Sequence, residues 1–124
     1  MTGFVVFAHG SRIEAANEAV RAVSAGMAGE LAAGGETVVE TAFLELGTPD
    51  LRGAVERLIK RGAVRIVVIP YFLTLGRHVE RDLPAIVREI SEQHGAIAIE
   101  ITPPLDGHPA LLEIMLERAR GALQ

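Results

Sequence analysis

Short apolar runs alternate with longer amphipathic stretches four times along the chain. The runs at residues 4–8, 37–46, 64–72 and 97–101 have the continuous or alternating hydrophobicity that is typical of β-strands. The stretches at 14–31, 49–61, 82–94 and 109–119 repeat apolar positions every three to four residues, as one face of a helix does. Such alternation predicts an α/β fold of three layers, α/β/α, in which right-handed crossovers join parallel strands.

Local signals predict where some helices begin and which faces they bury. We expect Thr48 to be an N-cap with Pro49 at the first helical position, and Asp82 to cap the third helix. His108 and Pro109 open the last helix. The first helix is expected to bury Ala16, Val20, Val23, Met27 and Leu31, the second Leu51, Ala54, Val55, Leu58 and Ile59, and the last Leu112, Met115, Leu116 and Ala119.

The composition of the strands predicts their order in the sheet. The first and third are apolar throughout, as central strands of a parallel sheet are, whereas the second and fourth carry polar residues and suit the edges. The order 2-1-3-4 satisfies this, and a length of 124 residues predicts a single domain over residues 1–124. Ligands of open α/β sheets bind at the carboxyl ends of the strands where the winding reverses, which here means the loops after Ala8 and Phe72.

Composition narrows the classes of partner. Hydrophobic residues make up 49% of the chain, the formal net charge is −4, and no apolar run is long enough to cross a bilayer. An acidic chain with no basic cluster and no leader pattern predicts a cytoplasmic protein that binds neither nucleic acid nor membrane. The absence of cysteine excludes disulfides and thiolate metal sites. The apolar excess fits a sheet buried on both faces, an interface with another chain, or both.

Histidines gather at the predicted edge of the sheet. His9 follows the first strand, His78 follows the third, and Glu45 ends the second. Two imidazoles and a carboxylate suit Co²⁺, Ni²⁺, Fe²⁺ or Zn²⁺. Each also has a structural alternative: the histidines as turn residues, and Glu45 as a helix cap. His108 fits an N-cap neighbour better than a ligand, although a metal contact stays open, and His94 suits a helix end.

Arginines near the same two loops provide positive charge for an anionic ligand. Arg12 follows the first strand, and Arg77 and Arg81 follow the third. Arginine binds carboxylates in a bidentate manner, and Ser11 lies beside Arg12 as a further polar contact. We therefore treat these residues as candidates for substrate binding, the alternative being surface ion pairs with Glu14, Glu80 or Asp82.

Four segments together resemble a known family. Phe7–Arg12, Glu40–Glu45, Ile69–Pro84 and Pro104–Pro109 are similar, in order and spacing, to the motifs of the small, single-domain sirohydrochlorin cobaltochelatase and ferrochelatase family. The resemblance implies a chelatase-like fold, and an enzyme that inserts a divalent metal into a tetrapyrrole during cobalamin or siroheme biosynthesis. It implies that His9 and His78 are catalytic and contact the metal, with Glu45 as a third ligand.

The resemblance also implies which small molecules take part. The divalent metal is a substrate, with Co²⁺ the first candidate and Fe²⁺ or Ni²⁺ as alternatives, and no organic cofactor is expected. Two other functions remain open. One is a metal or tetrapyrrole carrier without turnover, and the other is an enzyme of the histidine phosphatase type, although Ala8 stands where that family has an arginine.

A tetrapyrrole is broad compared with the edge of four strands, so we expect a symmetric homodimer that encloses it. Longer relatives of the family supply a second domain instead. The interface is expected to include apolar residues that the core does not need, namely Leu73, Leu75, Val79, Leu83 and Leu105.

Overall fold

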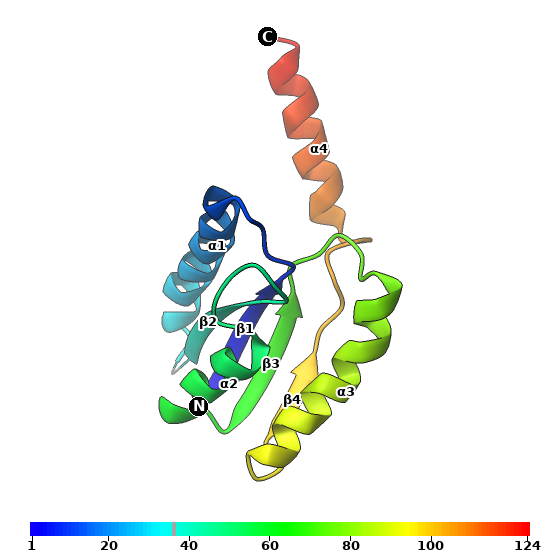
Figure 1. Ribbon diagram of the computed structural model, residues 1–124. Helices are drawn as coiled ribbons and strands as arrows, with labels where there is room; N and C mark the ends of the chain where they lie inside the picture. The colour runs from blue at the N-terminus through cyan, green and yellow to red at the C-terminus, as the bar shows by residue number, and fades with distance from the viewer. Residues whose placement is uncertain (36) are drawn as a thin grey trace.

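The structure, a computed structural model, describes residues 1–35 and 37–124 and consists of alternating strands and helices (Figure 1). These elements are β1 (Thr2–Ala8), α1 (Glu14–Ala32), β2 (Thr37–Phe43), α2 (Leu51–Lys60), β3 (Arg65–Pro70), α3 (Arg77–Gln93), β4 (Ala98–Ile101) and α4 (Pro109–Ala122).

The four strands form one parallel sheet in the order β2-β1-β3-β4, which confirms the predicted fold class and strand order. Helices α2 and α3 cover one face, where they enclose the larger core around Val5, Ile66 and Val68. Helix α1 covers the other face over β1 and β2. The winding reverses between β1 and β3, so the loops after these strands meet at one edge of the sheet.

Two helices begin at other residues than predicted. Asp50, not Thr48, is the N-cap of α2, because its carboxylate accepts a hydrogen bond from the backbone N–H of Gly53 at 2.9 Å. Helix α3 begins at Arg77, five residues before Asp82, since Gly76 adopts the extended N-cap conformation. His78 and Arg81 therefore lie on a helix, and not on the long loop that the sequence indicated.

Helix α1 buries part of the predicted face. Val20 is buried, Met27 packs half-buried against the same cluster and Leu31 is half-buried, whereas Ala16 and Val23 are exposed. Two residues that were not predicted, Asn17 and Ser24, are buried as well. These two polar residues can be buried because both form hydrogen bonds. The Thr41 hydroxyl on β2 donates to the Ser24 hydroxyl at 2.7 Å, and Asn17 binds the loops at the carboxyl edge. The second helix buries Leu51, Ala54, Val55 and Leu58 as expected and leaves Ile59 half-buried.

The last helix does not pack as predicted. Helix α4 projects beyond the carboxyl edge of the sheet, and none of its residues is buried, so Leu112, Met115, Leu116 and Ala119 do not face a core (Figure 1). The apolar residues that were predicted to form a dimer interface also need correction. Leu83 is 2% exposed and belongs to the core beneath α3, and Val79 packs against that core, whereas Leu73 is 65% exposed.

Candidate functional site

Backbone hydrogen bonds hold the carboxyl-edge loops together beyond the ends of the strands. The N–H of Leu44 donates to the carbonyl of Ala8 at 2.9 Å, and that of Glu45 donates to the carbonyl of His9 at 3.1 Å. Parallel pairing between the first two strands thus continues for two residues into the loops. This continuation places His9 and Glu45 at the same height above the sheet.

Gly10 is required for this close approach. Its φ of +95° lies in the left-handed region, and a Cβ atom there would lie 1.7 Å from the carbonyl oxygen of Glu45. A side chain at this position would therefore clash with the neighbouring loop as well as strain the backbone.

Asn17 links the same two loops from below. Its side chain is 1% exposed. Its amide nitrogen donates to the carbonyls of Ser11 at 2.9 Å and Leu46 at 3.0 Å, and its oxygen accepts from the N–H of Ser11 at 2.9 Å. A single buried side chain thus joins the loop after β1 to the loop after β2. Sequence reasoning missed Asn17 because it occupies a position of the helix where an apolar residue is usual.

His9 and Glu45 face each other at the open edge. The Nε2 atom of His9 lies 3.7 Å from Oε1 of Glu45, and each side chain is 58% exposed. The other ring nitrogen, Nδ1, lies 3.3 Å from the carbonyl of Gly10, which can only accept a hydrogen bond. This contact favours the tautomer with the proton on Nδ1 and leaves the Nε2 lone pair directed at Glu45. The edge of the His9 ring meets Phe72, with the ring centroids 6.4 Å apart.

The structural alternative for Glu45 does not hold, since Asp50 caps α2. An imidazole lone pair beside an exposed carboxylate is an arrangement that can bind a divalent cation and leave most of its coordination positions open.

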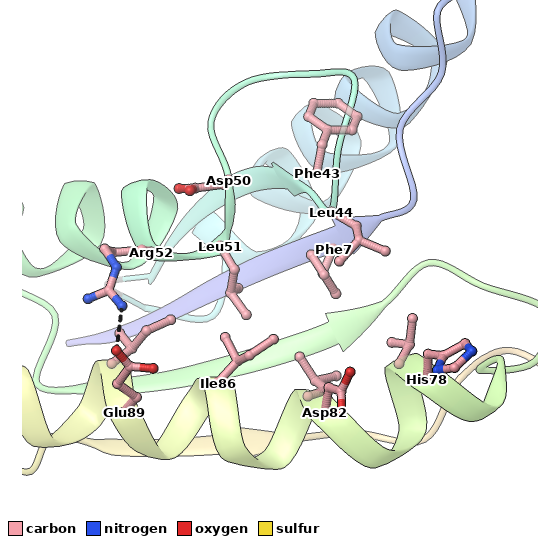
Figure 2. A pocket seen from close by; sticks show the side chains of 13 residues that line it. Phe7, Phe43, Leu44, Asp50, Leu51, Arg52, His78, Asp82, Ile86 and Glu89 are labelled. Carbon is pink, nitrogen blue, oxygen red and sulfur yellow. Dashed lines mark hydrogen bonds and ion pairs between the residues drawn. The ribbon is translucent and has the colours of Figure 1, made fainter.

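His78 lies at one end of a cavity of about 430 Å³ between α3 and the chain from β2 to α2. Figure 2 shows His78, Asp82, Ile86 and Glu89 following one another along α3, opposite Leu51 and Leu44. An ion pair between Arg52 and Glu89, at 3.5 Å, crosses the far end. The cavity is an apolar trough with polar groups at its rim, which suits a flat apolar ligand with charged substituents.

The candidate arginines differ in their contacts. Arg81 pairs with Asp82 at 3.0 Å, as the surface alternative predicted, and its Nη2 lies 3.3 Å from Nδ1 of His78. Because arginine only donates, this contact favours the His78 tautomer with the proton on Nε2. Arg12 and Arg77 form no ion pair with the described residues. Ser11 is half-buried, and its hydroxyl accepts from the N–H of Ile13 at 3.0 Å.

The structure brings together part of the predicted ligand set. Among the residues that it describes, no three histidine, aspartate or glutamate side chains are close enough to hold one metal ion. His9 and Glu45 form a pair, and His78 stands apart from it on α3. His108 caps α4, its Nδ1 accepting from the N–H of Ala110 at 3.0 Å, and His94 ends α3 with its Nε2 3.9 Å from Glu56.

Comparison with known proteins identifies the family. The model of the family described as CbiX matches residues 3–122. The chain belongs to the CbiX family. A sirohydrochlorin cobaltochelatase of Sulfolobus acidocaldarius is 32% identical over 123 residues, which cover 99% of this chain and 94% of that protein. The chloroplastic sirohydrochlorin ferrochelatase of Arabidopsis thaliana is 35% identical over 89 residues, and these cover 72% of this chain but only 40% of that protein.

Solved structures of CbiX-type proteins share the fold. A putative cobalamin biosynthesis CbiX protein from Marinobacter aquaeolei VT8 superposes with a TM-score of 0.79 at 26% identity. The superposition covers 99% of this chain and 98% of the Marinobacter protein. The sirohydrochlorin chelatase SirB of Bacillus subtilis subspecies spizizenii, in complex with cobalt, gives a TM-score of 0.81 at 24% identity. This chain spans half of that protein. In the described residues no helix of this CbiX protein is long and apolar enough to cross a membrane.

Proposed function

We propose that residues 1–124 act as one chelatase domain that inserts a divalent metal into a sirohydrochlorin-type tetrapyrrole. The observation that carries the proposal is the His9–Glu45 pair, whose Nε2 and Oε1 atoms face each other 3.7 Å apart at the open carboxyl edge. Two relatives, from Sulfolobus acidocaldarius and Priestia megaterium, are named sirohydrochlorin cobaltochelatases, and the one from Arabidopsis thaliana is named a ferrochelatase. Co²⁺ is our first candidate metal, with Fe²⁺ and Ni²⁺ as alternatives in cobalamin or siroheme-type pathways.

Each turnover places one M²⁺ on the ring nitrogens and releases the two protons of the ring N–H groups. His9, through Nε2, and Glu45 hold the incoming cation, and the exposure of both side chains leaves positions open for the ring. His78, at the end of the apolar cavity, is the third candidate ligand and a proton acceptor. Arg81 contacts Nδ1 of His78 in the structure, so a substrate carboxylate that draws Arg81 away would free this nitrogen to take a ring proton.

The acidic arms of the ring meet the arginines around these loops. Arg12 and Arg77 lack ion pairs with the described residues, and Arg81 can exchange Asp82 for a substrate carboxylate. Ser11 supports the loop beside them and is the weakest of the substrate-binding candidates, since its hydroxyl already serves a turn.

The proposal is tested by an anaerobic absorbance assay of sirohydrochlorin with Co²⁺, Fe²⁺ or Ni²⁺ and catalytic amounts of protein. His9→Ala, Glu45→Gln and His78→Ala should each reduce the insertion rate at least tenfold, while His94→Gln, a histidine away from the site, should retain it. Insertion limited to one equivalent of protein would indicate a carrier. Near wild-type rates in both histidine variants would refute the assignment.

We also propose that the working form is a homodimer, because one copy leaves its metal pair and cavity open on one side. Exposed apolar residues of the carboxyl-edge loops, Leu73 foremost at 65% exposure, are available for the contact.

A further inference from the structure

Leu46, the residue after Glu45, has a backbone conformation that leucine rarely adopts. Its φ is +56°, in the left-handed region, where a residue with a Cβ atom is strained and glycine or asparagine is usual. In the described part of the chain, Ala96 is the one other non-glycine residue with a positive φ. Ala96 follows the end of α3, where its N–H donates to the carbonyl of Ser91 at 2.9 Å and a left-handed residue is common. Leu46 lies in the loop between β2 and α2 and ends no helix.

The contacts around Leu46 fix the turn without using its side chain. The Asn17 amide donates to the backbone carbonyl of Leu46 at 3.0 Å. The N–H of Phe43 donates to the carbonyl of Pro49 at 2.9 Å, which closes the loop on itself. Gly47 lies so near the Phe43 ring that a Cβ atom there would be 2.8 Å from it. The backbone of the loop is therefore held by residues on either side of Leu46.

The side chain of Leu46 gains little from packing within its own chain. It is 49% exposed, and neither hydrophobic cluster of the described residues includes it. Leucine at this position thus carries the strain of a left-handed backbone without the stabilisation of a fully buried apolar side chain. Strain that the fold does not offset is concentrated at ligand sites, which makes this side chain a candidate for contact with a ligand.

The place of Leu46 beside the proposed metal ligands identifies the ligand. A metal ion enters a planar tetrapyrrole through one face of the ring, so the residues that hold the ion lie on that side. His9 and Glu45 hold it in the proposed function, and Leu46 directly follows Glu45 in the same loop. An apolar side chain at this place suits the apolar face of the ring, whereas the acidic arms at the ring's rim suit arginines.

We propose that Leu46 is a substrate-contact residue, whose side chain packs against the ring face that the metal enters and positions the ring over His9 and Glu45. The inference rests on the proposed function and adds a residue that binds the ring without holding the metal. Because the same contact is made before and during insertion, it should lower the Kd of the ring more than it raises kcat.

The size of the effect follows from the exposed part of the side chain. Covering about half of a leucine side chain contributes about four- to twelvefold in affinity. Leu46→Gly and Leu46→Asn, which both suit the left-handed backbone, should therefore raise the Kd of metal-free sirohydrochlorin by about this factor in an absorbance titration. Leu46→Met keeps an apolar side chain of similar volume and should bind the ring as the wild type does. This conservative variant separates loss of the contact from a disturbed loop.

Two control variants separate ring contact from backbone strain and from general adsorption of the ring. Ala96→Gly relieves the same backbone conformation away from the site. Neither Ala96→Gly nor Leu46→Gly should lower the urea midpoint of unfolding, but only Leu46→Gly should weaken ring binding. Val64 is 71% exposed and precedes β3 at the opposite edge of the sheet, so Val64→Ser should keep the ring affinity of the wild type.

The titrations distinguish failure of this inference from failure of the proposed function. If Leu46→Gly and Leu46→Asn bound the ring as the wild type does, the Leu46 contact would be refuted and the chelatase proposal would stand. Ring binding by the wild type without turnover would refute the chelatase but not the contact, and a wild type that does not bind the ring would refute both.

Two further measurements exclude other roles for Leu46. Co²⁺ affinity without the ring should be the same in Leu46→Asn and the wild type, because Asn17 still holds the backbone carbonyl of residue 46. A weaker Co²⁺ affinity would show that the leucine shapes the metal loop instead, and would overturn the inference. A changed mass in light scattering would place the side chain in a subunit contact, with the same consequence.

Discussion

Asn17 is the residue whose replacement tests most directly how the proposed metal ligands, His9 and Glu45, are held. Its amide joins the loop that carries His9 to the loop that carries Glu45, although Asn17 itself lies in α1 beneath them. Asn17→Ala removes all three hydrogen bonds to the two loops. Asn17→Asp has nearly the same shape and keeps the acceptor for the N–H of Ser11, but it lacks the NH₂ group that donates to both carbonyls.

The loss of folding stability caused by Asn17→Ala can be estimated from the hydrogen bonds that it removes. Each of the three hydrogen bonds, at 2.9, 2.9 and 3.0 Å, contributes about 0.5–1.5 kcal/mol net to folding, which gives about 3 kcal/mol for Asn17→Ala. The carbonyl of Leu46 and the N–H of Ser11 lose a partner, which puts the value toward the upper part of the range. A small domain has about 5–15 kcal/mol in all, so the variant should be destabilised but folded.

The Asn17 substitutions should also weaken metal binding, because they release the two loops that carry His9 and Glu45. Without Asn17 the residues around His9 and Glu45 are free to separate, and loss of a partner that orients metal ligands costs about 10–100-fold in affinity. We therefore expect Asn17→Ala and Asn17→Asp to weaken Co²⁺ binding at least tenfold. Asn17 bonds to Ser11, in the loop that carries His9, and to Leu46, in the loop that carries Glu45. One substitution therefore affects both loops.

The assay combines equilibrium urea unfolding with calorimetric titration of Co²⁺ at a temperature where every variant is folded. Ser24→Ala is the matched control, because Ser24 is also a buried polar residue of α1 but contacts Val20 and Thr41 instead of the loops. It should lose about 1 kcal/mol of stability and keep its metal affinity. If the Asn17 variants bound Co²⁺ as the wild type does while losing stability, Asn17 would have no positioning role. A stability loss below 1 kcal/mol would contradict the hydrogen-bond argument itself.

Two further predictions concern residues around the same loops. Gly10→Ala should abolish most metal binding and destabilise the fold by about 1–3 kcal/mol, because its Cβ would clash with the carbonyl of Glu45; a variant with unchanged Co²⁺ affinity would refute this. The hydrogen bond from Arg21 holds the pKa of Glu14 below its ordinary value of 4.5, so Arg21→Met should raise that pKa in an NMR titration. Because the folded-state pKa is lowered, the contribution of this pair is present above the ordinary value and lost as pH falls below it. The stability difference between wild type and Arg21→Met should therefore shrink in acid, and a constant difference would show that the packing of Arg21 over Phe43 dominates.

The sequence by itself determined the order of the strands and the edge of the sheet at which the candidate site lies. Apolar strands have to be central in a parallel sheet, and side chains that follow the ends of parallel strands meet at one edge, so the positions of His9 and Glu45 followed from local pattern alone. The prediction that Arg77, His78 and Arg81 lie on a loop was wrong, because α3 begins at Arg77 and its N-cap, Gly76, has no side chain that a sequence could reveal as a cap.

Only the tertiary structure decided which contacts are shared between distant segments. From the sequence, Asn17 is only a weak helix former. Its role in joining two loops depends on the fold, which brings Ser11 and Leu46 within hydrogen-bond distance of its side chain. The sequence offers one signal for Asn17, which is a polar residue on the helix side that carries the apolar Val20 and Met27. For α4 the apolar stripe predicted a buried face, but the structure buries none of the residues of this helix. Amphipathic periodicity indicates which side of a helix is apolar, but the direction of α4 depends on the preceding segment, where the N–H groups of Leu105 and Asp106 donate to the carbonyls of Phe72 and Leu73.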